Sequence, residues 1–98
     1  MREASIVDGE IVRDYLIEGK VRKVGAVRSD LFGFRVGRLE DVAEARMEEI
    51  NKAEANFLEK ASEQGGDMAH PGMVAVEDEL SGFYYFKGAI YARTESEN

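Results

Sequence analysis

A change in hydrophobic period after residue 38 constrains the fold of this chain more than any other feature. From there, apolar side chains recur at about 100° per residue, the spacing of one helix face. Glu40 and Asp41 occupy the first turn, where the helix dipole favours acidic groups, and Gly65 follows the last turn. The sequence therefore predicts a single helix over about residues 39–64. Its apolar stripe contains Leu39, Val42, Ala43, Met47, Ile50, Ala53, Phe57 and Ala61.

The residues before this helix have the composition and spacing of strands joined by tight turns. Asp8 with Gly9 predicts a two-residue hairpin turn, and Gly25 predicts a bulge within a longer strand. The predicted strands lie at 5–7, 11–17, 20–28 and 31–36.

After the helix, residues 65–72 contain three glycines and the single proline, which predicts a loop. Residues 73–77 and 83–93 then form a final hairpin. We expect an α+β fold: an antiparallel sheet of about four to six strands, with the long helix packed on one face. The order is strands, helix, hairpin. Residues 1–93 form one domain, and 94–98 a flexible C-terminal tail.

Charge is distributed unevenly along the 98 residues, whose net charge is −7. Residues 1–38 carry eight basic and six acidic side chains, whereas residues 39–98 carry five basic and fourteen acidic ones. A negative surface repels phosphate backbones, so direct binding to duplex nucleic acid is disfavoured and a basic protein partner is favoured. The chain contains no cysteine and no long apolar run. We therefore expect a cytoplasmic protein with no disulfide and no membrane segment.

The segment Asp30-Leu31-Phe32-Gly33-Phe34-Arg35 has aromatic residues beside a basic one, as in the base-stacking strand of RNA-recognition domains. Here the strand precedes the only predicted helix, and an acidic residue stands where that pattern begins with a basic one. We therefore expect Phe32 and Phe34 to pack beneath the helix. Three nearby arginines remain candidates for binding a small anion or nucleotide at an oligomer interface: Arg35, Arg38 and Arg46.

The helix face opposite the apolar stripe is acidic. Its carboxylates could imitate a phosphate backbone and occupy the nucleic-acid channel of another protein, although a solvated face is the more common role for such residues. The candidate contact residues on this face are Glu44, Glu48 and Glu59.

The last strand is aromatic on both faces, because successive strand residues point to opposite sides. Phe83, Tyr85 and Tyr91 share one face, whereas Tyr84 and Phe86 share the other. One helix covers only one face of a sheet, and an exposed aromatic patch often marks an interface. We therefore expect a homodimer or partner surface that includes Tyr84, Tyr85 or Tyr91.

No set of residues in the sequence forms a poised catalytic or metal-binding group. His70 is the only histidine, and the run from Glu77 to Glu79 lacks the spacing of a calcium loop. We expect no cofactor and no metal. The favoured function is that of a non-enzymatic, acidic binding protein. The alternatives are a binder of a small anionic ligand or nucleotide and a small enzyme of unknown class.

Strands followed by one acidic helix also resemble small antitoxin and phage-inhibitor domains. That resemblance lies in architecture alone. It implies a regulator or inhibitor of a partner that handles nucleic acid.

Overall fold

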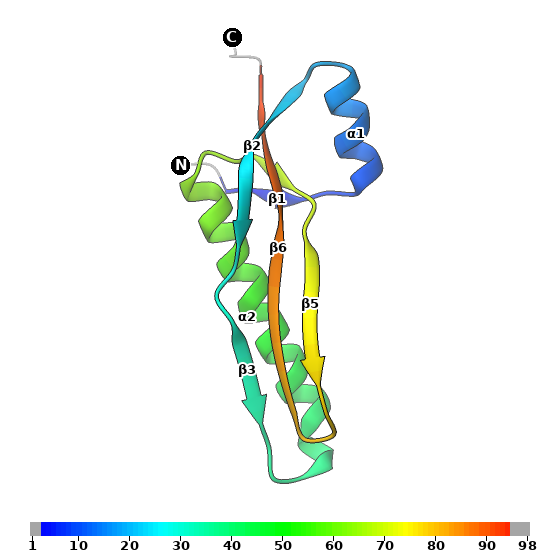
Figure 1. The fold of residues 1–98 in the computed structure, drawn as a ribbon, viewed down its shortest axis with the longest axis vertical. Coiled ribbons are helices and arrows are strands. Elements are labelled where there is room, and N and C mark those ends of the chain that lie inside the picture. The colour runs from blue at the N-terminus through cyan, green and yellow to red at the C-terminus, as the bar shows by residue number, and fades with distance from the viewer. Residues whose placement is uncertain (1–2, 95–98) are drawn as a thin grey trace.

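The computed structural model describes residues 3–94, which form a mixed sheet with one long helix packed on one face (Figure 1). The molecule is elongated, with extents of 54 × 25 × 17 Å. Its elements, in chain order, are β1 (Ser5–Ile6), α1 (Gly9–Ile17), β2 (Val21–Arg28), β3 (Phe32–Arg35), a 3-10 turn (Leu39–Asp41), α2 (Val42–Glu63), β4 (Met68–Ala69), β5 (Gly72–Glu77) and β6 (Ser81–Arg93).

Strand β6 is the centre of the sheet, and it pairs antiparallel with four other strands. β2 and β3 follow one another along one side of β6, and β4 and β5 follow one another along the other. β1 pairs in parallel with β4, so the sheet is mixed rather than purely antiparallel. The predicted α+β class, with one long helix on the sheet, is confirmed.

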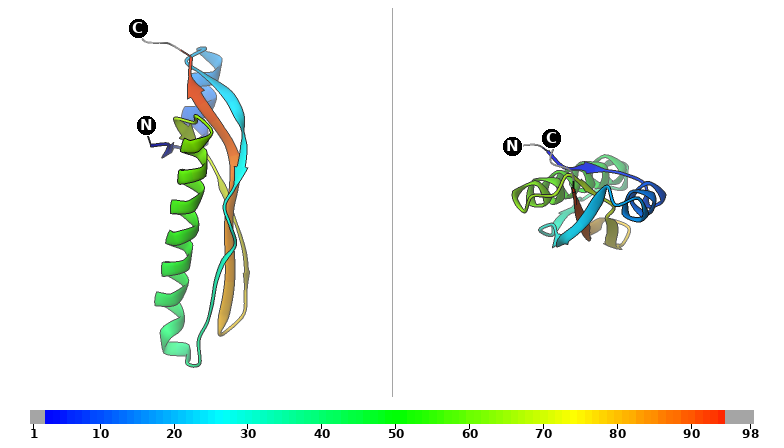
Figure 2. Two further views of the ribbon diagram at one scale, coloured as in Figure 1. Left: turned by 90° about the vertical axis from the view of Figure 1, so that its left-hand side faces the viewer. Right: turned by 90° about the horizontal axis from the view of Figure 1, so that it is seen from above.

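The predicted long helix is confirmed as α2, which runs along one side of the sheet (Figure 2). Val42, Ala53, Phe57 and Ala61 are buried against the strands. The two alanines are 0% exposed, because their small side chains let the helix backbone approach the sheet closely. Met47 was predicted on the apolar stripe but is 58% exposed.

The predicted strand at 11–17 was wrong, because Gly9–Ile17 forms helix α1. Asp8 is extended, and its carbonyl accepts the N–H of Val12 at 3.1 Å, so this residue precedes a helix rather than a hairpin turn. The helix closes at Gly19, which has a φ of +75°. Asp and Gly suit a helix start as well as a turn, and nine residues are too few for periodicity to separate the two structures.

The remaining strands follow the sequence prediction with one exception. The register of β2 against β6 shifts between Lys23 and Gly25, as expected for the predicted bulge. The predicted loop at 65–72 contains β4, whose two residues pair with both β1 and β6. Two residues are too few to produce a recognisable strand pattern.

The core lies between α2 and the sheet. Its largest fully buried side chains are Phe57, Tyr84 and Ile90. At the end of β6, Thr94 donates its N–H to the carbonyl of Lys20 at 3.0 Å, and the rest of the predicted tail, 95–98, lies outside the described residues. Within residues 3–94, neither helix combines the length and the apolar character needed to cross a membrane.

Candidate protein-binding surface

The side chains of β6 alternate between the two faces of the sheet, as predicted. Tyr84, Phe86 and Ile90 point toward α2 and are buried, whereas Phe83 and Tyr85 point away from it. Tyr84 was predicted to contact a partner, but this residue is 0% exposed. Tyr84 lies on the helix side of β6, because neighbouring residues of a strand point to opposite faces of the sheet.

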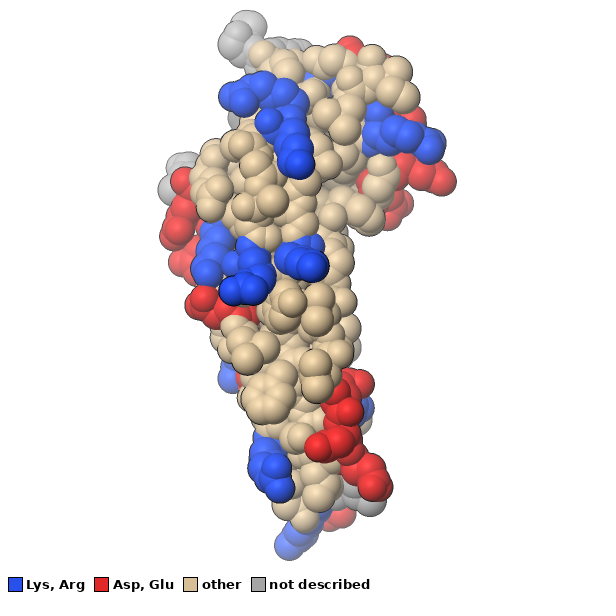
Figure 3. Space-filling model, in the orientation of Figure 1, with Lys and Arg blue, Asp and Glu red and all other residues tan. Residues whose placement is uncertain are grey.

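The face of the sheet that points away from α2 carries a continuous set of exposed side chains. Phe83 is 48% exposed, Val76 opposite it on β5 is 68% exposed, and Leu31 before β3 is 63% exposed. Figure 3 looks onto this face and shows uncharged side chains along much of its length. We call this surface the outer sheet face and define it by Arg28, Leu31, Val74, Val76, Phe83, Tyr85 and Lys87.

Gly33 makes room for the most prominent ring of this surface. Gly33 pairs with Phe83 across β3 and β6, and a side chain at Gly33 would overlap the Phe83 ring. That side chain would also lie 2.8 Å from the carbonyl oxygen of Gly82. The ring of Phe83 therefore lies across the backbone of β3. The sequence Phe32-Gly33-Phe34 thus places its own rings on the helix side and receives a ring from β6 on the outer side.

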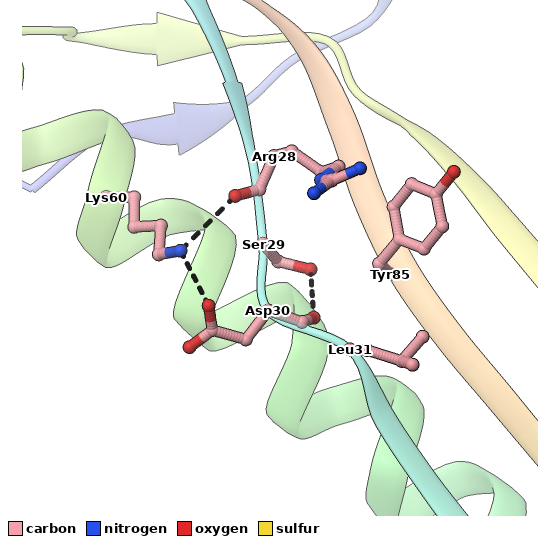
Figure 4. A pocket seen from close by; sticks show the side chains of 6 residues that line it. All are labelled: Arg28, Ser29, Asp30, Leu31, Lys60 and Tyr85. Carbon is pink, nitrogen blue, oxygen red and sulfur yellow. Dashed lines mark hydrogen bonds and ion pairs between the residues drawn. The ribbon is translucent and has the colours of Figure 1, made fainter.

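A cavity of about 320 Å³ opens at the junction between β2 and β3 (Figure 4). The guanidinium of Arg28 lies 5.4 Å from the centre of the Tyr85 ring, close enough for a cation–π interaction. The ammonium of Lys60, from α2, is 2.8 Å from a carboxylate oxygen of Asp30. The charge of Lys60 is therefore balanced, whereas Arg28 has no ion pair within the described part of the chain.

Arg46 of α2 takes part in a network that joins the helix to the hairpin. Its Nε donates to the hydroxyl of Tyr84 at 3.1 Å and lies 2.6 Å from Oε2 of Glu77. The Tyr84 hydroxyl donates to the same oxygen at 2.5 Å. Burial raises the pKa of Tyr84, and the hydrogen bond from Tyr84 followed by the charge of Arg46 lowers the pKa of Glu77. This network occupies the guanidinium and connects α2, β5 and β6.

The structure does not gather the three predicted ligand-binding arginines around the cavity at the β2–β3 junction. Arg46 is held by Glu77 and Tyr84, Arg38 lies 3.5 Å from Glu40 in an exposed pair, and Arg35 is exposed on β3. The cationic residues that line the cavity are Arg28 and Lys60, which sequence reasoning did not select. Their proximity depends on how α2 packs beside the end of β2, which no local pattern reveals.

The acidic face of α2 is exposed as predicted. Glu44, Glu48 and Glu59 all lie at the helix surface, and none of them has an ion pair within residues 3–94. Lys52 lies on the same helix and is 3.0 Å from Glu49, the acidic neighbour that raises the pKa of Lys52.

Tyr91 lies apart from the outer sheet face. This half-buried residue lines a cavity of about 210 Å³ beside α1, together with Val12, Leu16 and His70. His70 is exposed, and its Nδ1 lies 2.9 Å from the carbonyl oxygen of Val7. Of the three tyrosines predicted to contact a partner, only Tyr85 belongs to the outer sheet face. Across the described residues, no group of three or more His, Asp or Glu side chains is placed to hold a metal ion.

Comparisons of the chain with protein-family models, with curated proteins and with solved structures found no match.

Proposed function

We propose that this is a non-enzymatic binding protein that acts by protein–protein contact through the outer sheet face. The observation that carries the proposal is the exposure of Leu31, Val76 and Phe83 on a face of the sheet that points away from α2. Scattered exposed apolar residues are normal, but a contiguous patch with an aromatic ring at its centre is typical of interfaces.

The charged residues at one end of this surface indicate which chemical groups a partner would present. Arg28 and Lys87 lie opposite one another on β2 and β6 at one end, and the Arg28 guanidinium is 5.4 Å from the centre of the Tyr85 ring. Tyrosine and arginine are enriched among the residues that dominate binding energies. The outer sheet face therefore suits a protein that presents an apolar patch next to carboxylates.

The proposal is tested by affinity capture from extracts of the cells that make the protein. We compare the unchanged protein with a variant that combines Phe83→Ser and Val76→Lys. Both side chains are exposed, so the variant retains its fold, which circular dichroism checks. We expect one protein to be captured by the unchanged chain and lost, at least tenfold, with the double variant.

The matched control combines Glu44→Lys and Glu48→Lys, which reverses two charges on the opposite side of the molecule. We expect this control to retain the same captured protein. Equal capture by the Phe83→Ser, Val76→Lys variant would overturn the proposal.

A second candidate function follows from the acidic face of α2. Glu44, Glu48 and Glu59 form an exposed acidic set without ion pairs among residues 3–94, and such a set suits a basic protein that handles nucleic acid. The protein would then regulate or inhibit that partner by covering its basic surface. The same two variants distinguish the candidates: the α2 charge reversals abolish this interaction, and the outer-face substitutions leave it intact.

A further inference from the structure

Strand β5 is exposed on both of its faces. On the outer side, Val76 is 68% exposed, and on the helix side Met73 is 46% exposed and Ala75 is also exposed. The cause is the position of α2, which packs on β6, β3 and β2 and leaves the inner side of β5 largely open (Figure 1). The strand carries one charged residue, Glu77. An apolar strand that is open on both faces and along one edge is typical of a strand that pairs with another chain.

Alternation of hydrogen bonds identifies the backbone groups at the free edge of β5. The N–H of Asp78 donates to the carbonyl of Ser81 at 3.0 Å, which places residue 78 in a hydrogen-bonded pair with β6. Bonding alternates along an antiparallel pair, so Val76, Val74 and Gly72 also bond to β6. The N–H and C=O groups of Met73, Ala75 and Glu77 therefore point away from β6, toward the edge of β5 along which no strand pairs in the described part of the chain.

The opposite edge of the sheet is less suited to pairing with a strand of another chain. β2 carries three basic side chains, Arg22, Lys23 and Arg28, and is interrupted by the bulge before Gly25. β3 has only four residues, and the N–H of Asp30 just before it is taken by Asn56 at 2.8 Å. Charges, bulges and short strands are the features that keep a sheet edge from pairing. Pairing is therefore favoured at β5.

We infer that β5 pairs antiparallel with β5 of a second copy of the chain, about a twofold axis that passes through Ala75. In this register Ala75 faces Ala75 of the partner subunit, and Met73 faces the partner's Glu77. The outward-pointing backbone groups of all three residues then form hydrogen bonds with the other strand. Residue 73 of each strand lies opposite residue 77 of the other, and residue 75 lies opposite residue 75. On the outer side Val74 lies opposite the partner's Val76. The inference goes beyond the proposed function, because it concerns the free edge of β5 rather than the outer sheet face and names a second copy of the chain as a partner.

The distribution of charge along β5 also favours an antiparallel pair. Glu77, whose carboxylate is paired with Arg46, ends the strand, and Asp78 and Glu79 follow it, whereas Lys87 lies opposite Gly72 at the other end of the strand. Figure 3 shows acidic side chains gathered on the right-hand side near the β5–β6 turn, and basic side chains both farther along the sheet and at the lower end of the molecule. Antiparallel pairing places the acidic end of one strand near Lys87 of the other, whereas parallel pairing would bring the two acidic ends together.

Sedimentation equilibrium over a wide range of protein concentration tests this inference. We expect the mass to rise reversibly from the 10.9 kDa of one chain to twice that value. Ala75→Lys and Ala75→Glu each place like charges opposite one another at the axis, so each variant remains monomeric. An equimolar mixture of the two variants restores the dimer, because the charges are then opposite. The control Ala26→Lys makes the same change at an exposed site on β2 and leaves dimerisation unchanged.

Amide hydrogen exchange provides a second measurement that depends on the register. We expect the amides of Met73, Ala75 and Glu77 to become protected as protein concentration rises. The amides of Val74 and Val76 are protected at every concentration, because they bond to β6. A monomer at all concentrations, or dimerisation of Ala75→Lys equal to that of the unchanged chain, would overturn the inference.

These outcomes are distinct from failure of the proposed function. A monomer that captures a partner and loses that partner with Phe83→Ser and Val76→Lys overturns the second-copy pairing alone. If the protein dimerises but captures the same proteins with and without the outer-face substitutions, only the proposed function is overturned.

Discussion

Single residues decide which groups reach the surface, and Gly33 shows this most clearly. We expect Gly33→Ala to lower the free energy of unfolding by about 1–3 kcal/mol, because its methyl group must displace the Phe83 ring and approach the backbone of Gly82. Urea denaturation measures the change. Gly37→Ala is the matched control, since a side chain placed there has no atom within 4 Å apart from those of its chain neighbours. Equal stability of the two variants would show that the ring does not lie across β3.

The Arg46–Tyr84–Glu77 network makes stability depend on pH at both ends of the scale. The pKa of Glu77 is lowered from 4.5, so its contribution is complete above that value and is lost as pH falls through the lowered pKa. The pKa of Tyr84 is raised from 10.0, so its contribution is complete below that value and is lost as pH rises through the raised pKa.

Thermal unfolding from pH 2 to 11, with Glu77→Gln and Tyr84→Phe beside the unchanged chain, measures these contributions. We expect Glu77→Gln to flatten the acidic limb and Tyr84→Phe to flatten the alkaline limb. Profiles identical to that of the unchanged chain would contradict the network.

At the scale of elements, the junction between β2 and β3 is held by Ser29 rather than by regular pairing. Its N–H donates to the carbonyl of Phe86, and its hydroxyl accepts the buried N–H of Phe86 at 2.9 Å. Ser29→Ala leaves that N–H without a partner, so we expect a loss of about 1–3 kcal/mol in the free energy of unfolding. Chemical denaturation checks this value, with Ser5→Ala at an exposed position as the control. A loss no larger than that of the control would contradict the role of Ser29.

Helices and strands with a clear hydrophobic period could be predicted from the sequence. Elements that are very short, or whose first residues fit both a turn and a helix, could not. The stripe through Val42, Phe57 and Ala61 predicted α2, and β6 alternates as its aromatic residues indicated. Asp8 with Gly9 fits both a hairpin and a helix start, so α1 was missed, and β4 is too short to leave a pattern.

The candidate surface was only partly predictable for a different reason. Tyr85 was identified, but the assignment of Tyr84 to the opposite, buried face depends on which side of the sheet α2 covers. Arg28 and Lys87 lie far apart in the sequence and meet only through the register of β2 with β6. Contacts of this kind are set by tertiary pairing, which residue spacing does not reveal.

At the scale of the whole molecule, one long helix and one sheet form a thin, elongated body with extents of 54 × 25 × 17 Å. A chain of this shape buries one face of its sheet and leaves most of the other to solvent or to a partner. Small domains bury a limited share of their surface, so association is a common way for them to gain stability. The exposed outer sheet face, the free edge of β5 and the acidic face of α2 are three of the exposed surfaces of residues 3–94.

We propose that the outer sheet face is the contact surface for another protein. Photo-crosslinking in the cells that make the protein tests it most directly, with a photoreactive phenylalanine analogue in place of Phe83 and, as a control, in place of the exposed Glu48 on α2. We expect a specific crosslinked protein at position 83 and none at position 48. Absence of a crosslink at position 83, or the same product at both positions, would contradict it.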